Sequence, residues 1–145
     1  FDCKVIVSTH PRTRVRLESE GLKNDDVFMP PFGFFDYIAL QKNAKCVISD
    51  SGTISEESNL LKFPAVTVRD AHERPEIMDA GGLIMTSLDT QKITDAVNIA
   101  TQFPPSKIDA VKDYRGGQVS RKILYSVMSY IDLINRETWR KSERS

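Results

Sequence analysis

The stretch VISDSGTISEE, residues 47–57, decides the fold class of this chain. An apolar, strand-like run ends at Ser49, and a turn of small residues, Ser51-Gly52-Thr53, opens directly into a sequence with helical periodicity. A strand followed by a tight turn and a helix is the repeating unit of α/β folds. These residues therefore predict a parallel sheet covered by helices.

The same alternation extends over the rest of the chain. Strands are expected at residues 3–8, 26–29, 46–49, 65–68 and 82–85, and helices at 11–20, 34–43, 53–62, from Pro75, at 90–102 and at 117–135. Five such strands predict an open, Rossmann-like parallel sheet with helices on both faces. The last helix carries an apolar stripe formed by Val119, Ile123, Val127, Tyr130 and Ile134.

Length and composition indicate one globular domain. The chain has 145 residues, of which 40% are hydrophobic and 28% charged. We expect residues 1–135 to form this domain and residues 136–145 to form a tail. The chain starts with Phe1 inside an expected strand, which suggests a piece of a longer protein.

Several classes of function are disfavoured. The 20 basic and 20 acidic residues give no net charge, so the basic excess of a nucleic-acid-binding protein is missing. No apolar run approaches the roughly 18 residues of a membrane span. Cys3 and Cys46 suit reduced thiols in the cytoplasm, and neither they nor the histidines, His10 and His72, have the spacing of metal ligands. Glycine motifs for dinucleotides and the P-loop lysine are also missing.

The turn at 51–53 is a candidate anion site. Small side chains let a ligand approach the backbone, and the start of the following helix favours negative charge. A simple helix cap and tight turn would use the same residues. Glu57 favours a ligand, because it lies on the inward stripe with Ile54 and Leu61 while Glu56 points elsewhere. Ribose hydroxyls beside a bound phosphate would give this carboxylate a partner.

The segment RDAHERPE, residues 69–76, follows the buried strand at 65–68. Its charges could pair locally in a solvated loop, with little effect on stability. Alternatively, Arg74 presents its guanidinium to a phosphate or to Glu57. The position at the carboxyl end of a strand favours the second interpretation, because parallel sheets bind ligands there.

Two further strand ends carry candidate residues. In STHPR, residues 8–12, His10 either caps the following helix or donates a proton or hydrogen bond to a diphosphate leaving group. In PPFGFFDY, residues 30–37, the aromatic side chains either join the core or flank a flat base.

Together, the segments STHPR, DSGTISEE (50–57) and RDAHERPE resemble the non-hydrolysing UDP-N-acetylglucosamine 2-epimerase family. The segment YRGGQVSRKI (114–123) is similar to the glycine-containing C-terminal signature of that family. The resemblance implies the C-terminal, UDP-binding half of a glycosyltransferase-B-like (GT-B-like) fold of two domains. It implies an isomerase that inverts C2 of a UDP-N-acetylamino sugar by eliminating UDP to give a 2-acetamidoglycal and adding UDP back.

The resemblance also implies a role for individual residues. His10 would bind the diphosphate or donate a proton near it, and Tyr37 and the backbone of 34–36 would lie along the uracil. Ser51, Gly52 and Thr53 would hold phosphate. Glu57 would bind the ribose, and Arg74 would support these phosphate- and ribose-binding residues. No cofactor and no metal are implied. The partner is a UDP-sugar, and the full-length enzyme is expected to be a cytoplasmic homodimer.

Two positions depart from the common family pattern. Gly52-Thr53 stands where most members have Gly-Gly, and Ala71-His72 where most have Thr-Thr. These pairs resemble the branch that makes UDP-N-acetyl-L-fucosamine for capsule or O-antigen. In this family the acidic residues for proton transfer at C2 lie in the N-terminal domain. The chain alone is therefore expected to bind UDP but not to epimerise a UDP-sugar.

Two alternatives stay open at this point. A UDP-sugar-dependent glycosyltransferase of the same fold would share the ribose-binding glutamate and the phosphate turn. A receiver-like regulatory domain could use Asp50 as phosphoacceptor, but it would need an acidic pair and a lysine at other strand ends.

Overall fold

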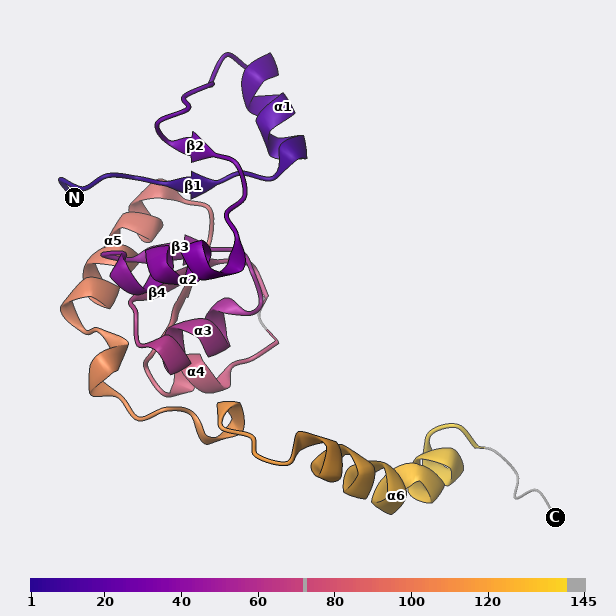
Figure 1. Cartoon of the computed structure of the whole chain (residues 1–145). Coiled ribbons are helices and arrows are strands. Elements are labelled where there is room, and N and C mark those ends of the chain that lie inside the picture. Colours follow the sequence, from indigo (N-terminus) through magenta and orange to yellow (C-terminus); the bar gives the residue numbers. More distant parts are fainter. Residues whose placement is uncertain (72, 141–145) are drawn as a thin grey trace. The chain divides into compact units, whose positions relative to one another are not determined.

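A computed structural model describes residues 1–71 and 73–140 of the chain (Figure 1). Strands and helices alternate along it. The strands are β1 (Val7–Ser8), β2 (Phe28–Met29), β3 (Val47–Ser49), β4 (Ala65–Val68) and β5 (Ile84–Thr86). The helices are α1 (Pro11–Ser19), α2 (Phe34–Asn43), α3 (Ile54–Leu61), α4 (Glu76–Asp79), α5 (Thr90–Gln102) and α6 (Val119–Glu137), with 3₁₀ turns at Pro105–Lys107 and Lys112–Tyr114.

The chain divides into two compact units, Phe1–Ile108 and Asp109–Ser145. The first unit contains all five strands and the helices α1 to α5. The described part of the second unit contains α6. A single domain over residues 1–135 stays a prediction.

Every strand pairing is parallel, which confirms the α/β fold class. The strands, however, form two sheets, β1–β2 and β3–β4–β5, where one sheet was expected. The first expected strand, at residues 3–8, is shorter than predicted, because only Val7 and Ser8 pair with a neighbouring strand, and that strand is β2. Val5 and Ile6, which the apolar pattern placed in a covered strand, are 58% and 39% exposed.

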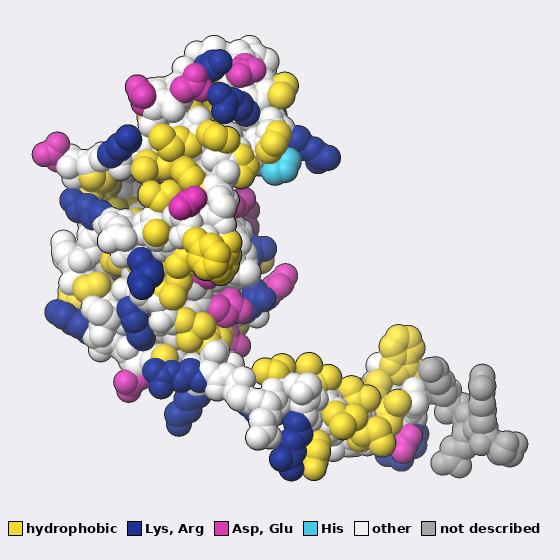
Figure 2. Space-filling model, in the orientation of Figure 1, with side chains coloured by type: hydrophobic (Ala, Val, Ile, Leu, Met, Phe, Trp, Pro, Cys, Tyr) yellow, Lys and Arg dark blue, Asp and Glu magenta, His cyan; other side chains and the backbone are white. Residues whose placement is uncertain are grey.

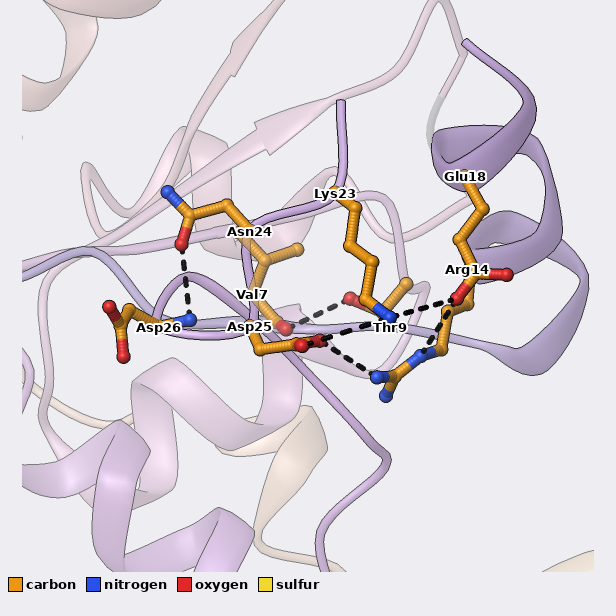
Figure 3. Close-up of polar contacts among 8 residues, drawn as sticks. All are labelled: Val7, Thr9, Arg14, Glu18, Lys23, Asn24, Asp25 and Asp26. Carbon is orange, nitrogen blue, oxygen red and sulfur yellow. Dashed lines mark hydrogen bonds and ion pairs between the residues drawn. The ribbon is translucent and has the colours of Figure 1, made fainter. Parts of the chain in front are cut away.

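Surface charges connect α1 to the loop before β2 (Figure 3). The Arg14 guanidinium lies 2.8 Å from Asp25 and 3.8 Å from Glu18, and the Lys23 ammonium lies 3.7 Å from Glu18. All four side chains are well exposed to water, so these pairs contribute little to stability. No residue of α1 is buried, so this region depends on strand pairing and surface contacts.

The core lies around β4, the central strand of the three-stranded sheet. Val66 is fully buried and packs in one cluster with Ala96, Val97 and Ala100 of α5. The fully buried Phe63 and Ile77 extend the apolar interior of the first unit. Consecutive residues Ala65, Val66 and Thr67 are all buried, so β4 is covered on both faces, as expected for a buried strand at 65–68.

The helix α6 has the amphipathic pattern expected for residues 117–135, but its apolar stripe is exposed. Ile123 is 59% exposed and Val127 50% exposed, and Figure 2 shows apolar side chains along this helix. The helix continues to Glu137, two residues beyond its expected end, and residues 141–145 of the expected tail lie outside the described residues. No described helix is both long and apolar enough to cross a bilayer.

Candidate functional site

The site predicted at the carboxyl ends of β3 and β4 is built on parallel pairing. Ser49 and Thr67 are partners in register, so the loops at 50–53 and 69–75 leave the same edge of the sheet. Residues that are about 20 positions apart in sequence are thereby brought together. His72, part of the Ala71-His72 departure, lies outside the described residues.

The turn 51–53 is held by its own hydroxyl groups. The Ser51 and Thr53 hydroxyl oxygens lie 3.0 Å apart, and the Ser51 amide donates to the Ser49 hydroxyl at 3.1 Å. Thr53 precedes α3 with helical backbone angles, and its side chain makes no capping hydrogen bond to the helix. The Ser51 hydroxyl instead accepts from the Thr53 amide at 3.4 Å, and the Ser51 carbonyl accepts from the Ile54 amide, so the cap and tight turn are observed at Ser51.

Arg74 joins the turn to α3. Its Nη1 donates to the Gly52 carbonyl at 3.2 Å, and its Nε lies 2.6 Å from Oε1 of Glu56. Of the two partners considered for Arg74, a phosphate and Glu57, the second is not observed, because the guanidinium pairs with Glu56. Adjacent residues of a helix point about 100° apart, and Glu56 is the one that faces the loop carrying Arg74.

A second guanidinium lies beside the same glycine, and sequence reasoning missed it. A Cβ atom added to Gly52 would lie 3.0 Å from Nη1 of Arg74 and 3.4 Å from Nη1 of Arg69. Arg69 is the first residue after β4, so its position at the strand end was the available signal. Gly52 thus brings its backbone close to two cations, which suits an anionic ligand.

Glu57 has a different partner, Gln41, also missed from the sequence. Gln41 Nε2 of α2 donates to Oε2 of Glu57 on α3 at 2.6 Å, and Gln41 is only 3% exposed. Glu57 itself is half-buried, in line with its place on the inward stripe. A lone glutamine in a helix carries no motif, so only its spacing of four from Tyr37 pointed to it.

Tyr37 lies in the same environment as Glu57. Burial raises the pKa of its phenol, the carboxylates of Glu57 and Asp50 raise it further, and a hydrogen bond with Gln41 opposes the rise. The phenol is therefore neutral at physiological pH and able to donate a hydrogen bond. Phe34 and Phe35, by contrast, are 72% and 84% exposed, so the core interpretation is wrong for them.

His10 is placed apart from these contacts. It precedes α1 with an extended backbone, and its Nδ1 accepts a hydrogen bond from the Arg12 amide at 3.2 Å. The capping alternative is thus observed. Over residues 1–71 and 73–140, no group of three or more His, Cys, Asp or Glu side chains could hold a metal ion.

Comparisons with known proteins agree on one family. A family model described as UDP-N-acetylglucosamine 2-epimerase matches residues 1–128. The UDP-N-acetylglucosamine 2-epimerase of Methanocaldococcus jannaschii is 36% identical over 105 residues, which cover 68% of this chain and 29% of that protein. A UDP-2,3-diacetamido-2,3-dideoxy-D-glucuronate 2-epimerase of Pseudomonas aeruginosa is 30% identical, over 82% of this chain and 33% of that protein.

Solved structures give the same result. The UDP-N-acetylglucosamine 2-epimerase of Rickettsia bellii matches 94% of this chain and 39% of its own, with 49% identity and a TM-score of 0.73. The M. jannaschii enzyme in complex with UDP-GlcNAc and UDP matches 89% of this chain and 36% of its own, with 30% identity and a TM-score of 0.71. The chain thus spans 29–39% of the length of these relatives. Because the family model covers most of its residues, the chain belongs to the UDP-N-acetylglucosamine 2-epimerase family.

Proposed function

We propose that this chain forms the UDP-binding part of a UDP-N-acetylamino-sugar 2-epimerase, which inverts C2 by eliminating UDP and adding it back. One observation carries the proposal. The turn at Gly52, two arginines and the Gln41–Glu57 pair occur together where β3 and β4 lead into the following loops and helix. Cations for a diphosphate and an acceptor for hydroxyl groups are what a nucleoside diphosphate requires.

The diphosphate end of the proposed site carries the chemistry. Elimination of UDP leaves negative charge on the departing phosphate, so fixed donors at that point stabilise the transition state. Arg69, Arg74 and the hydroxyl groups of the turn are the donors that this chain offers. His10 would contribute a further hydrogen bond or a proton to the same group.

The nucleoside end is assigned to the helices. Glu57 would accept hydrogen bonds from the ribose hydroxyls. Tyr37, whose pKa is raised in part by the negative charge of Glu57, would lie beside the uracil. Both residues are half-buried, which strengthens hydrogen bonds relative to those made in water.

The relatives support the nucleotide more firmly than the sugar. One is named for UDP-N-acetylglucosamine and another for a diacetamido-glucuronate, and both names contain UDP. The Gly52-Thr53 and Ala71-His72 pairs support UDP-N-acetyl-L-fucosamine chemistry as a finer proposal. A homodimeric, cytoplasmic enzyme serving capsule or O-antigen synthesis is proposed on the family resemblance alone.

Calorimetric titration of the purified chain with UDP tests the binding function. Glu57→Ala should weaken UDP binding by about 1–3 kcal/mol through loss of hydrogen bonds to a charged group. Glu20→Ala, at an exposed glutamate outside the site, is the matched control and should leave binding unchanged. Equal affinity of the folded Glu57→Ala variant would contradict the ribose role.

The reaction is tested on the whole protein that contains this chain. Incubation with a UDP-N-acetylamino sugar in D2O should place deuterium at C2, because the proton is removed and returned on the other face. A glycosyltransferase of the same fold would bind UDP without this exchange. Absence of exchange with UDP-N-acetylglucosamine and with its 6-deoxy relatives would remove the epimerase proposal.

A further inference from the structure

Gln41 is a buried polar residue to which the proposed function gives no role. It lies on α2 and is 3% exposed. Its Nε2 donates to Glu57 on α3, but its Oε1 accepts no hydrogen bond from any described residue. Burying an unpaired amide oxygen destabilises a protein, whereas an apolar side chain of the same shape would pack there without that cost. Joining two helices is thus a poor explanation for a glutamine at this position.

The contact with Glu57 leaves its two carboxylate oxygens unequal. The hydrogen bond of 2.6 Å uses one of the two lone pairs of Oε2, whereas Gln41 leaves both lone pairs of Oε1 open to ribose hydroxyls. A buried donor also fixes the rotamer of the carboxylate before a ligand arrives. A preformed geometry lowers the entropy that is lost on binding.

Gln41 also lies on the same helix face as the second side chain of the proposed nucleoside site. Tyr37 is four residues earlier on α2, a spacing that makes the two side chains neighbours. The Gln41 amide, however, donates its hydrogen bond to Glu57, so Gln41 is expected to act through Glu57.

We propose that Gln41 is a positioning residue, which holds Glu57 in the geometry that recognises the ribose of a uridine nucleotide. This inference rests on the proposed function. It predicts that Gln41 acts on ligand binding through Glu57 and makes no contribution to binding of the diphosphate.

Two ligands separate these effects in calorimetric titrations of the purified chain: UDP and 2′,3′-dideoxy-UDP, which lacks both ribose hydroxyls. The unmodified chain should prefer UDP by about 10- to 100-fold, the range expected for hydrogen bonds to a charged group. Gln41→Met, which keeps the side-chain volume and removes the amide, should reduce this preference at least about fivefold. Lys42→Met on the exposed side of the same helix is the matched control and should keep it.

A double variant shows whether Gln41 acts through Glu57. In a Glu57→Ala background, Gln41→Met should change UDP affinity by less than about twofold. Additive losses would overturn the inference. If Gln41→Met does not give a folded circular dichroism spectrum, Gln41→Leu replaces it, since it also fills the apolar site, lacks any hydrogen-bond donor and should lose the ribose preference.

The outcomes distinguish the two proposals. If Gln41→Met and Gln41→Leu keep the full preference for UDP while Glu57→Ala loses it, Gln41 has no positioning role and the proposed function stands. If the unmodified chain binds both nucleotides equally, or neither of them, the ribose site itself is wrong, and the inference falls with it.

Discussion

The ion pair between Arg74 and Glu56 permits a quantitative test of how the turn is held. Arg74→Met removes the 2.6 Å pair with Glu56 and the hydrogen bond to the Gly52 carbonyl, while the methionine keeps most of the apolar stem in place. Glu56→Gln removes the charge of the partner and keeps its shape. Neither change touches the apolar core around Val66.

The magnitude follows from the exposure of the pair. The two side chains are 36% and 31% exposed, so solvent screening limits the ion pair to roughly 1 kcal/mol. The charged donor on the Gly52 carbonyl adds about 1 kcal/mol, less than the roughly 1.5–3 kcal/mol of bonds to charged groups, because the Arg74 side chain is partly exposed to water. Oε2 of Glu56 is buried without a partner among the described residues, so loss of Arg74 leaves that carboxylate poorly compensated. Arg74→Met should therefore lower the free energy of unfolding by about 2 kcal/mol.

Urea unfolding followed by circular dichroism measures this for the single and double variants. Arg74→Met and Glu56→Gln should show a coupling energy of about 1 kcal/mol. Arg136→Met removes a 2.8 Å pair with Glu137 whose side chains are 70% and 63% exposed, and it should cost almost nothing. A coupling energy within error of zero, or equal losses for Arg74→Met and Arg136→Met, would refute the reasoning.

Three further changes test separate parts of the structure. Gly52→Val should leave the fold intact and weaken UDP binding at least about tenfold in calorimetry, because its side chain displaces two flexible guanidinium groups. Gly82→Ala should lower the urea-unfolding free energy by about 1–3 kcal/mol, because its Cβ would overlap Ile77. Burial raises the pKa of Cys46 to about 11, so at pH 8 a thiol reagent should label Cys46 about 100-fold more slowly than the exposed Cys3. Because the pKa of Cys46 is higher in the folded than in the unfolded chain, the stability that the thiol contributes is present below about pH 8.5 and falls as pH rises toward about 11. The unfolding free energy of Cys46→Ala should therefore depend less on pH between these values than that of the unmodified chain. Equal labelling rates would contradict the burial of Cys46.

The elements that sequence predicted best are those with signals at both ends. The helix at 34–43, the strand at 65–68 and the helix at 90–102 have the predicted bounds. Gly33 precedes α2, and the Asp89 side chain accepts from the Lys92 amide at the start of α5. Such local signals act within a few residues, so one sequence suffices to read them.

The prediction of a buried first strand at residues 3–8 was wrong because an apolar pattern shows that side chains favour burial but does not show which segments bury them. A run of Val and Ile predicts burial on both faces, but burial depends on which other segments reach those faces. Within the expected strand at residues 3–8, only Val7 and Ser8 pair with a neighbouring strand, which is β2. The apolar stripe of α6 has the same character, since periodicity identifies a face and does not identify what packs on it.

Residue type and position grouped the candidate residues more accurately than they predicted the contacts. Position at strand ends grouped Gly52 with Arg74, because parallel strands deliver their carboxyl ends to one edge, and the ligand-binding roles of these residues stay predictions. The partners of these residues depend on side-chain direction over distances of a few ångströms. Arg74 reaches Glu56, and Glu57 reaches Gln41, and neither contact has a sequence spacing that would announce it.

Two consecutive glutamates on α3 therefore separate two tasks that a single carboxylate could not perform together. Glu56 neutralises Arg74 and holds its guanidinium against the Gly52 carbonyl, and Arg69 adds a second cation beside the same glycine. Glu57, about 100° further round the helix, meets an uncharged amide donor from Gln41 and makes no ion pair with Arg74. If Arg74 paired with Glu57 instead, the acceptor proposed for the ribose would be neutralised, and Glu56 would stand unpaired beside the proposed diphosphate. The observed pairing avoids both costs, which explains why the arginine and the two carboxylates are arranged in this way.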